Sequence, residues 1–274
     1  MYKYVLSIAL VSTAVVVAYF KLLDTGGKPS TVPAVSYVEV AEEESLIPST
    51  PTEPGEDPSG EASTPDPAPQ IEIPESDAIA EDEPLPAQFN LAVPFTSQAP
   101  HANWELPYAE TCEEASSYMV SEYYKGTVSG KIDPDVADEV ILDLVDFQTD
   151  FLGFYLDTTA AETVSFIDPY FGYIGLVEED PTVEMIKREI ASGKPVIIPA
   201  AGRELGNPNF TGLGPLYHML VIKGYTEDSF ITNDPGTRNG ENYVYDIQVI
   251  MDAIGDWNDG DPENGAKVVI FTQP

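Results

Sequence analysis

One cysteine dominates the reactive side chains of this sequence, and polar residues suited to assist it lie further along the chain. Cys112 cannot form an internal disulfide, because the 274 residues include no second cysteine. A thiolate is a strong nucleophile, and a neighbouring imidazole can hold it as an ion pair and later protonate a leaving group. His218 is the candidate imidazole, and Asp234 can fix the tautomer of its ring. These three residues predict hydrolysis through a covalent intermediate on Cys112.

A glutamine upstream of the cysteine could complete such a site. Gln98 lies 14 residues before Cys112 (112 − 98), and its side-chain amide could donate a hydrogen bond to a developing oxyanion. The expected catalytic set is therefore Gln98, Cys112, His218 and Asp234.

Each of these residues also has a purely structural interpretation. Cys112 could be a packed apolar thiol, and His218 could be a hydrogen-bonded histidine at the edge of a strand. Asp234 lies in the sequence NDPG, which any turn favours, and Asn233 could take its role. Gln98 could equally be an ordinary structural glutamine.

A helix is expected to position the cysteine. Thr111 and Glu114 have the spacing of a capping box, and Gly126 can end the helix, so residues 112–125 are predicted to be helical. Cys112 would then lie in the first turn, where unpaired backbone N–H groups and the helix dipole stabilise a thiolate.

The remaining periodicity predicts an α+β fold, with helices in the first half of the domain and an antiparallel sheet in the second. His218 begins one predicted strand and Asp234 follows the next, so antiparallel pairing could bring the two side chains together. The aromatic stretch 151–157 is expected in the core. Further helices are expected over about 133–147, 160–167 and 183–192, and strands over 195–200, 218–224, 229–233, 242–245 and 267–271.

The chain divides into three segments. Residues 1–23 contain an uncharged apolar run of 17 residues, 4–20, which is long enough for a transmembrane anchor and fits a cleaved signal peptide less well. Residues 24–88 are rich in Pro, Glu, Ser and Thr and are predicted to form a disordered acidic stalk, with a partner-binding tail or a cover for the cleft as alternatives. Residues 89–274 are long enough for one folded domain. We expect the domain to face outward from the membrane.

The charge of the chain excludes several kinds of partner. With 47 acidic and 12 basic residues the formal net charge is −35, which repels nucleic acid and anionic membrane surfaces. The loop DWNDGDPENG is interpreted as an acidic surface loop rather than a calcium site, because its spacing does not match an EF-hand. Two histidines and one cysteine offer too few ligands for zinc. No cofactor or metal is expected.

Three stretches of the sequence resemble a known family. They are VPFTSQAPHANW…TCEEASSYMV, IKREIASGKPVIIP and YHMLVIKGY…FITNDPGT. They are similar to papain-like cysteine peptidases related to the bacteriocin-processing, double-glycine leader peptidases of cysteine-peptidase family 39. The resemblance implies a papain-like fold, a peptide or protein substrate, and the catalytic roles given above.

The sequence departs from that family directly after the nucleophile. The family commonly has a small residue there, whereas this chain has Glu113 and Glu114. Two carboxylates beside a thiol oppose its ionisation, although they also favour the helix dipole.

These observations predict a membrane-tethered, extracytoplasmic cysteine peptidase that hydrolyses peptide or isopeptide bonds through an acyl-enzyme on Cys112. It would be secreted if residues 1–23 were cleaved. The main alternative is an inactive papain-like binding or adhesion module on a stalk. A cell-wall amidase, an acyl transferase and leader-peptide processing in trans stay open, and the sequence predicts no oligomeric state.

Overall fold

The structure is a computed structural model that describes residues 30–37, 40 and 84–274. The predicted anchor over 1–23 lies outside the described residues, as does most of the predicted stalk over 24–88. Among the residues that are described, no helix is long and apolar enough to cross a membrane.

The helices agree closely with the sequence pattern. Asp133 caps α4 by accepting from the Asp135 N–H, and a full capping box between Thr159 and Glu162 begins α5, which Gly172 ends in a left-handed conformation. The predicted ends fall a few residues short for α4 and α5, because both helices run on into aromatic residues. The main helices are α3 (Cys112–Tyr124), α4 (Pro134–Phe151), α5 (Ala160–Phe171), α6 (Val183–Ala191) and α7 (Ile247–Ala253), with short 3-10 turns η1 (Tyr108–Glu110) and η2 (Pro262–Asn264).

The strands form one antiparallel sheet in the order β2-β7-β3-β4-β5-β6, with β1 pairing to β4. Every residue of β3 and β4 is buried, as expected for central strands covered on both faces. The strands are β1 (Phe89–Asn90), β2 (Ile174–Glu179), β3 (Val196–Ala201), β4 (Tyr217–Tyr225), β5 (Ser229–Asn233), β6 (Tyr243–Asp246) and β7 (Val268–Gln273).

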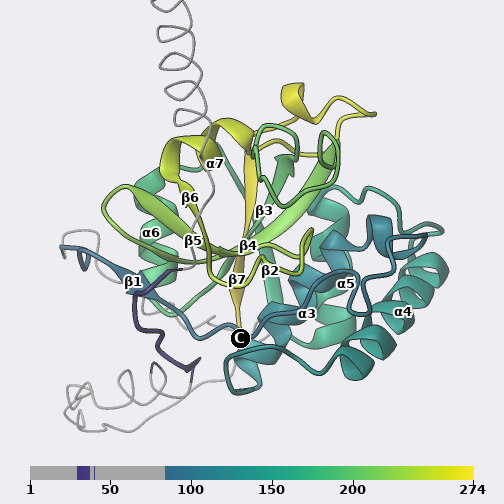
Figure 1. The fold of residues 1–274 in the computed structure, drawn as a ribbon, viewed down its shortest axis with the longest axis horizontal. Helices are drawn as coiled ribbons and strands as arrows, with labels where there is room; N and C mark the ends of the chain where they lie inside the picture. Colours follow the sequence, from purple (N-terminus) through teal and green to yellow (C-terminus); the bar gives the residue numbers. More distant parts are fainter. Residues whose placement is uncertain (1–29, 38–39, 41–83) are drawn as a thin grey trace, which may run out of the picture.

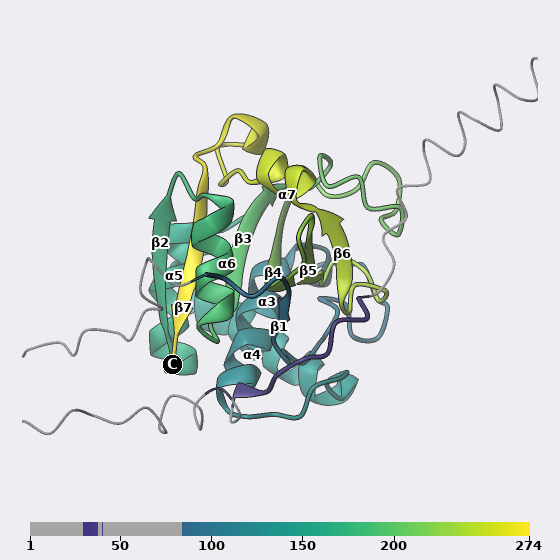
Figure 2. The ribbon, with the colours of Figure 1, turned by 90° about the vertical axis from the view of Figure 1, so that its left-hand side faces the viewer.

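The helices lie on both sides of this sheet. Figure 1 shows α3, α4 and α5 grouped together, with the strands between them and α6. Helix α3 packs on β4 and α5 packs on β2, while α6 contacts β4 and β3. Figure 2, turned by 90°, views the molecule from the side on which α6 lies in Figure 1. The predicted α+β arrangement, with the nucleophile helix packed on an antiparallel sheet, is confirmed.

Some local expectations are wrong. Residues 151–157 were expected in the core, but Phe151, Phe154 and Leu156 are 51%, 40% and 45% exposed. Phe151 ends α4, and Phe154 and Leu156 lie in the loop between α4 and α5. Strand β2 and helix α7 were not predicted: β2 alternates weakly because its outer face is exposed, and α7 is only seven residues long.

A short piece of the predicted stalk packs on the domain. Val35 forms a parallel bridge with Leu91, donating from its N–H to Asn90 O and accepting from the Ala92 N–H. Tyr37 packs edge-on against Tyr123 and Tyr124 of α3, with ring centroids 5.6 and 5.4 Å apart. At these residues the structure differs from the expectation of a disordered stalk, because apolar side chains within VPAVSYVEV find partners on the domain.

A buried lysine stabilises this attachment. Lys223 lies at the irregular register between β4 and β5, and its ammonium donates to Asn90 Oδ1 at 3.0 Å and Asn242 Oδ1 at 2.8 Å. Asn90 Nδ2 in turn donates to Val32 O, and the Ser30 N–H donates to Asn242 O. Burial lowers the pKa of Lys223 to about 7, which nearby Glu241 partly opposes.

Candidate active site

Cys112 is the first residue of α3, as predicted, but the helix begins differently from the prediction. The expected capping box is absent: Thr111 makes no side-chain cap, and its hydroxyl donates to Gln98 O at 3.1 Å. Glu114 accepts a hydrogen bond from Gln148 instead of turning back to the helix start. The first turn of α3 therefore keeps backbone N–H groups that no side chain caps, directly at the thiol.

The thiol of Cys112 is oriented toward a carboxylate. Its Sγ–H donates to Glu113 Oε2 at 3.0 Å, and the residue is only 6% exposed. Burial raises the pKa of the Cys112 thiol well above its usual value, and the charge of Glu113 adds to this rise. A backbone hydrogen bond from Met219 on β4 acts in the opposite direction but does not cancel it. In this conformation Cys112 is a neutral thiol.

The two glutamates after the cysteine are both buried. Burial raises the pKa of Glu113 to about 8, and Glu110 and Asp157 add smaller repulsions. Burial also raises the pKa of Glu114 well above its usual range, with the charge of Glu113 as the next cause. One oxygen of each carboxyl group, Oε1 of Glu113 and Oε2 of Glu114, has no hydrogen-bond partner among the described residues. This side of the site is polar, buried and incompletely hydrogen-bonded.

His218 and Asp234 form the contact that the sequence predicted. His218 lies near the start of β4 and Asp234 directly follows β5, and these adjacent antiparallel strands place His218 Nε2 2.8 Å from Asp234 Oδ1. Both side chains are fully buried, at 1% and 0% exposed. Since Nε2 is used by the carboxylate, Nδ1 is the ring nitrogen available for proton transfer.

A network of donors holds Asp234 in its charged form. Besides the histidine it accepts from the Gly236 N–H at 2.9 Å, from Asn207 Nδ2 at 2.9 Å and from Tyr245 Oη at 2.6 Å. Burial opposes the ionisation of Asp234, but His218 and these hydrogen bonds outweigh it and lower its pKa. Sequence reasoning missed Asn207 and Tyr245, which lie in a loop and on the next strand and carry no local motif.

Glycine is required beside this histidine. A Cβ atom on Gly236 would lie 2.8 Å from His218 Cε1 and 3.0 Å from His218 Nε2, closer than packed atoms normally approach. The NDPG turn therefore brings its backbone, and the Gly236 N–H, against the imidazole and the carboxylate at once. The alternative role for Asn233 is not what the structure has, because its amide donates to the Val93 and Pro94 carbonyls.

Gln98 is next to the start of α3 but is oriented differently from the prediction. Its Nε2 donates to Tyr108 O at 2.9 Å and to Ala109 O at 3.1 Å, which occupies both amide protons. Its Oε1 is buried without a hydrogen-bond partner among the described residues. In this conformation the side chain holds η1 in place and offers no free N–H to an oxyanion.

The predicted nucleophile and base are adjacent without being hydrogen-bonded. Met219, whose backbone contacts the thiol, directly follows His218 in β4, and Ser116 of α3 also donates to Met219 O at 3.1 Å. Within the part of the chain that the structure describes, no hydrogen bond joins Cys112 Sγ to the imidazole; the thiol bonds to Glu113 instead. The structure thus brings together His218 with Asp234 and Cys112 with β4, and it leaves the thiol turned away.

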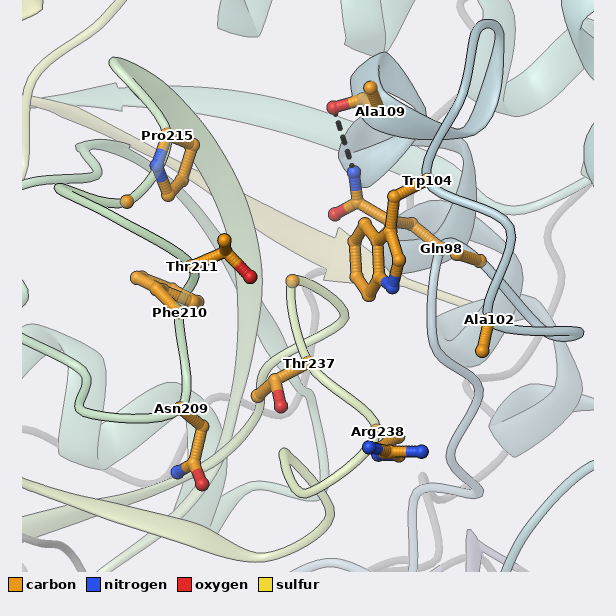
Figure 3. Close-up of a pocket in the computed structure, with 13 residues that line it drawn as sticks. Gln98, Ala102, Trp104, Ala109, Asn209, Phe210, Thr211, Pro215, Thr237 and Arg238 are labelled. Carbon is orange, nitrogen blue, oxygen red and sulfur yellow. Dashed lines mark hydrogen bonds between the residues drawn. The ribbon is translucent and has the colours of Figure 1, made fainter.

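A cavity of about 720 Å³ opens beside these residues. Figure 3 shows Trp104 and Phe210 on opposite sides of it, with Gln98 behind Trp104 and with Thr237 and Arg238 along another edge. Phe210, which lines the cavity, packs edge-on against the buried His218 ring, with centroids 5.5 Å apart. Its lining comprises Gln98, Ala99, Ala102, Trp104, Ala109, Asn209, Phe210, Thr211, Gly214, Pro215, Gly236, Thr237 and Arg238.

His101 and the acidic loop near residue 260 take no part in these contacts. His101 is exposed and pairs with Asp135 at 3.2 Å, so it is a loop residue. In the acidic loop near residue 260, Asp256 turns inward and accepts from the Ala160 N–H and from Tyr217 Oη. Among the described residues, no group of three or more His, Cys, Asp or Glu side chains is arranged to hold a metal ion.

Comparison with known proteins places this fold and site in a family. Residues 90–259 match the model of the Peptidase_C39 like family, a match that covers more than half of the chain and includes Gln98, Cys112, His218 and Asp234. Comparison with curated proteins finds no match. A crystal structure of a Bacillus anthracis protein described as a candidate C39-like peptidase aligns with a TM-score of 0.44 at 16% identity, covering 68% of this chain and 98% of that chain. On the family match, the chain belongs to the Peptidase_C39 like family and is a cysteine peptidase.

Proposed function

We propose that this peptidase hydrolyses peptide or isopeptide bonds through a thioester on Cys112, with His218 as general base and acid and Asp234 orienting the imidazole. The observation that carries the proposal is the buried His218–Asp234 pair, 2.8 Å apart, one residue from the backbone group that contacts the Cys112 thiol. A buried imidazole with one nitrogen fixed by a charged carboxylate is suited to transfer a proton at the other. The proposal is also supported by the cavity whose lining residues Phe210 and Gly236 lie against the His218 ring.

The reaction follows from these positions. Cys112 Sγ attacks the carbonyl carbon while its proton passes to His218 Nδ1, forming the carbon–sulfur bond. The carbon–nitrogen bond then breaks, and His218 returns the proton to the leaving amine. Water next attacks the thioester, losing a proton to His218, and the carbon–sulfur bond breaks to release the acid and restore the thiol.

Two groups could stabilise the oxyanion in this scheme. The uncapped start of α3 offers backbone N–H groups beside the sulfur, without any rearrangement. Gln98 could donate only after its amide turns away from the Tyr108 and Ala109 carbonyls. We therefore assign the main donor role to the start of α3 and a supporting role to Gln98.

Glu113 keeps the enzyme in a resting state in this proposal. Its Oε2 accepts the Cys112 S–H, so attack requires the thiol to rotate from the carboxylate toward the imidazole. Rotation about one bond of a small side chain is fast compared with typical turnover. A bound substrate would activate the site if it separated the Glu113 carboxylate from the Cys112 thiol, or if it lowered the pKa of the thiol.

The location at the outer face of a membrane is also part of the proposal. It is supported by the 17-residue apolar run over 4–20, which is followed directly by a proline-rich acidic segment. Separation of cell membranes from soluble protein, with an alkaline wash, tests the anchor on which this location depends. Retention of the full chain and release of a variant lacking residues 2–23 would support the anchor, whereas release of both would refute it.

An inactive binding module is the second candidate, and the thiol orientation toward Glu113 favours it. The decisive experiment incubates the full chain with a complex peptide mixture and identifies new termini by mass spectrometry. The proposal predicts new termini that disappear in both Cys112→Ala and His218→Ala variants. Peptides that bind without any new terminus would instead support the binding module.

A further inference from the structure

The cavity beside His218 carries an arginine whose charge no residue of the domain neutralises. Arg238 is exposed at the cavity edge, four residues after Asp234. Among the described residues, no carboxylate forms an ion pair or hydrogen bond with it; the ion pairs there join other residues. Because the chain has 47 acidic residues and 12 basic ones, carboxylates that could pair with its basic side chains are abundant. Arg238 is therefore available to a ligand.

The walls near Arg238 are apolar and aromatic. Trp104 is 44% exposed in the cavity, and Phe210 faces it from the other side while packing against the His218 ring. Aromatic walls of this kind bury flat or branched apolar groups. A group held between them would contact Phe210, which packs on the imidazole, while Arg238 lies at another edge of the same cavity.

We propose that this cavity selects peptides that carry an apolar side chain and a neighbouring carboxylate, with the apolar group between Trp104 and Phe210 and the carboxylate on Arg238. A guanidinium binds a carboxylate through two parallel N–H donors, which fixes the register of the peptide. The carboxylate comes either from an Asp or Glu side chain or from the C-terminus of the peptide. This inference names the substrate class of the proposed function and rests on it.

Binding tests this selection independently of turnover. The full chain with Cys112→Ala is titrated by calorimetry with three peptides: acetyl-Ala-Phe-Glu-amide, acetyl-Ala-Phe-Gln-amide and acetyl-Ala-Phe-Gln with a free C-terminus. At least one carboxylate peptide should bind about fivefold tighter than the uncharged one, as expected for a partly exposed charged pair. Tighter binding of the third peptide than of the second would identify the C-terminal carboxylate as the source. Tighter binding of the first peptide than of the second would identify the Glu side chain.

Variants assign the preference to its residue. In Arg238→Gln the preference should fall to about one, whereas Arg188→Gln, which removes an equal charge paired with Glu184 on α6, should keep it. Trp104→Ala should weaken all three peptides together, because it removes the apolar wall. Equal binding of the three peptides to the parent, or a preference that survives in Arg238→Gln, would overturn the inference.

Turnover by the chain with Cys112 intact separates this inference from the proposed function. Carboxylate-selective binding without hydrolysis would refute the proposed function and leave the selection standing. Hydrolysis without any preference for a carboxylate would refute only the selection.

Discussion

The two sides of the active site differ in how completely their buried polar groups are hydrogen-bonded. On the sheet side, Asp234 accepts four hydrogen bonds that include the imidazole, and its neighbours fix both of its oxygens. On the helix side, Gln98, Glu113 and Glu114 each bury an oxygen without a partner among the described residues, and the thiol bonds to a carboxylate. A fully bonded network resists rearrangement, whereas unpaired buried groups favour it. We infer that the base is fixed in place and that the nucleophile moves.

Removal of Asp234, on the sheet side of the site, should have the largest effect on activity. Replacing Asp234 with Ala removes the group that orients His218, and we expect kcat/KM to fall on the order of 10³-fold. Asp234→Asn, which can still accept from Nε2–H, should retain more activity. The measurement is kcat/KM on a peptide cleaved by the parent, with thermal unfolding to identify variants that do not fold. Equal activity of all three proteins would contradict a fixed base.

Removal of the Glu113 charge, on the helix side of the site, should make the Cys112 thiol more reactive. In Glu113→Gln the carboxylate charge that raises the pKa of Cys112 is gone, although burial still acts. We expect the pKa of the thiol to fall, and the rate of alkylation by iodoacetamide at pH 9, where Glu113 of the parent is ionised, to rise about tenfold. Glu122→Gln, on the same helix and paired with Lys125, is the matched control and should leave the rate unchanged. A slower reaction in Glu113→Gln would mean that Glu113 assists the thiol.

The buried Glu113, on the helix side of the site, should also make the stability of the fold depend on pH. Burial raises the pKa of Glu113 from 4.5 to about 8, so the folded protein keeps a proton that the unfolded chain releases. The stability from that proton is fully present below about pH 4.5 and is lost as the pH rises through about 8. Glu113→Gln should therefore raise the unfolding temperature by a few degrees, about 2–4 °C, at pH 8 relative to the parent, and by less at pH 5. A parent that gains stability between pH 5 and pH 8 more steeply than the variant would contradict this.

Removal of a single hydrogen-bond donor to Asp234, on the sheet side of the site, should have a small effect on activity. Tyr245→Phe removes one of the donors to Asp234 but leaves Asn207 and the Gly236 N–H in place. We expect kcat/KM to fall about threefold, as for the loss of one hydrogen bond among several. Tyr243→Phe, on the same strand, removes a hydroxyl that Asp234 does not use and is the control. A loss as large as that of Asp234→Ala would mean that the network is less redundant than the structure indicates.

The sequence predicted what depends on local pattern and missed what depends on distant partners. The bounds of α3, β4 and β5, and with them the meeting of His218 and Asp234, follow from periodicity and turn residues. Asn207 and Tyr245 could not be predicted, because nothing near them in the sequence shows that Asp234 lies beside them. The capping box at Thr111 was predicted from spacing alone and is absent, because Thr111 and Glu114 find partners at Gln98 and Gln148.

The stalk shows the same limit. Composition predicts disorder over 24–88, but a few apolar residues such as Val35 and Tyr37 find partners on β1 and α3. Average composition over 65 residues conceals a short segment that pairs with a strand.

The most direct test of the account is to look for the covalent intermediate on Cys112. The full chain is mixed with a peptide that it cleaves, quenched in acid within one turnover, and analysed by intact mass and peptide mapping. The account predicts an adduct on Cys112 that has the mass of the N-terminal product minus water, and that is absent from Cys112→Ala together with all hydrolysis. Hydrolysis that continues in Cys112→Ala, or an adduct on another residue, would contradict it.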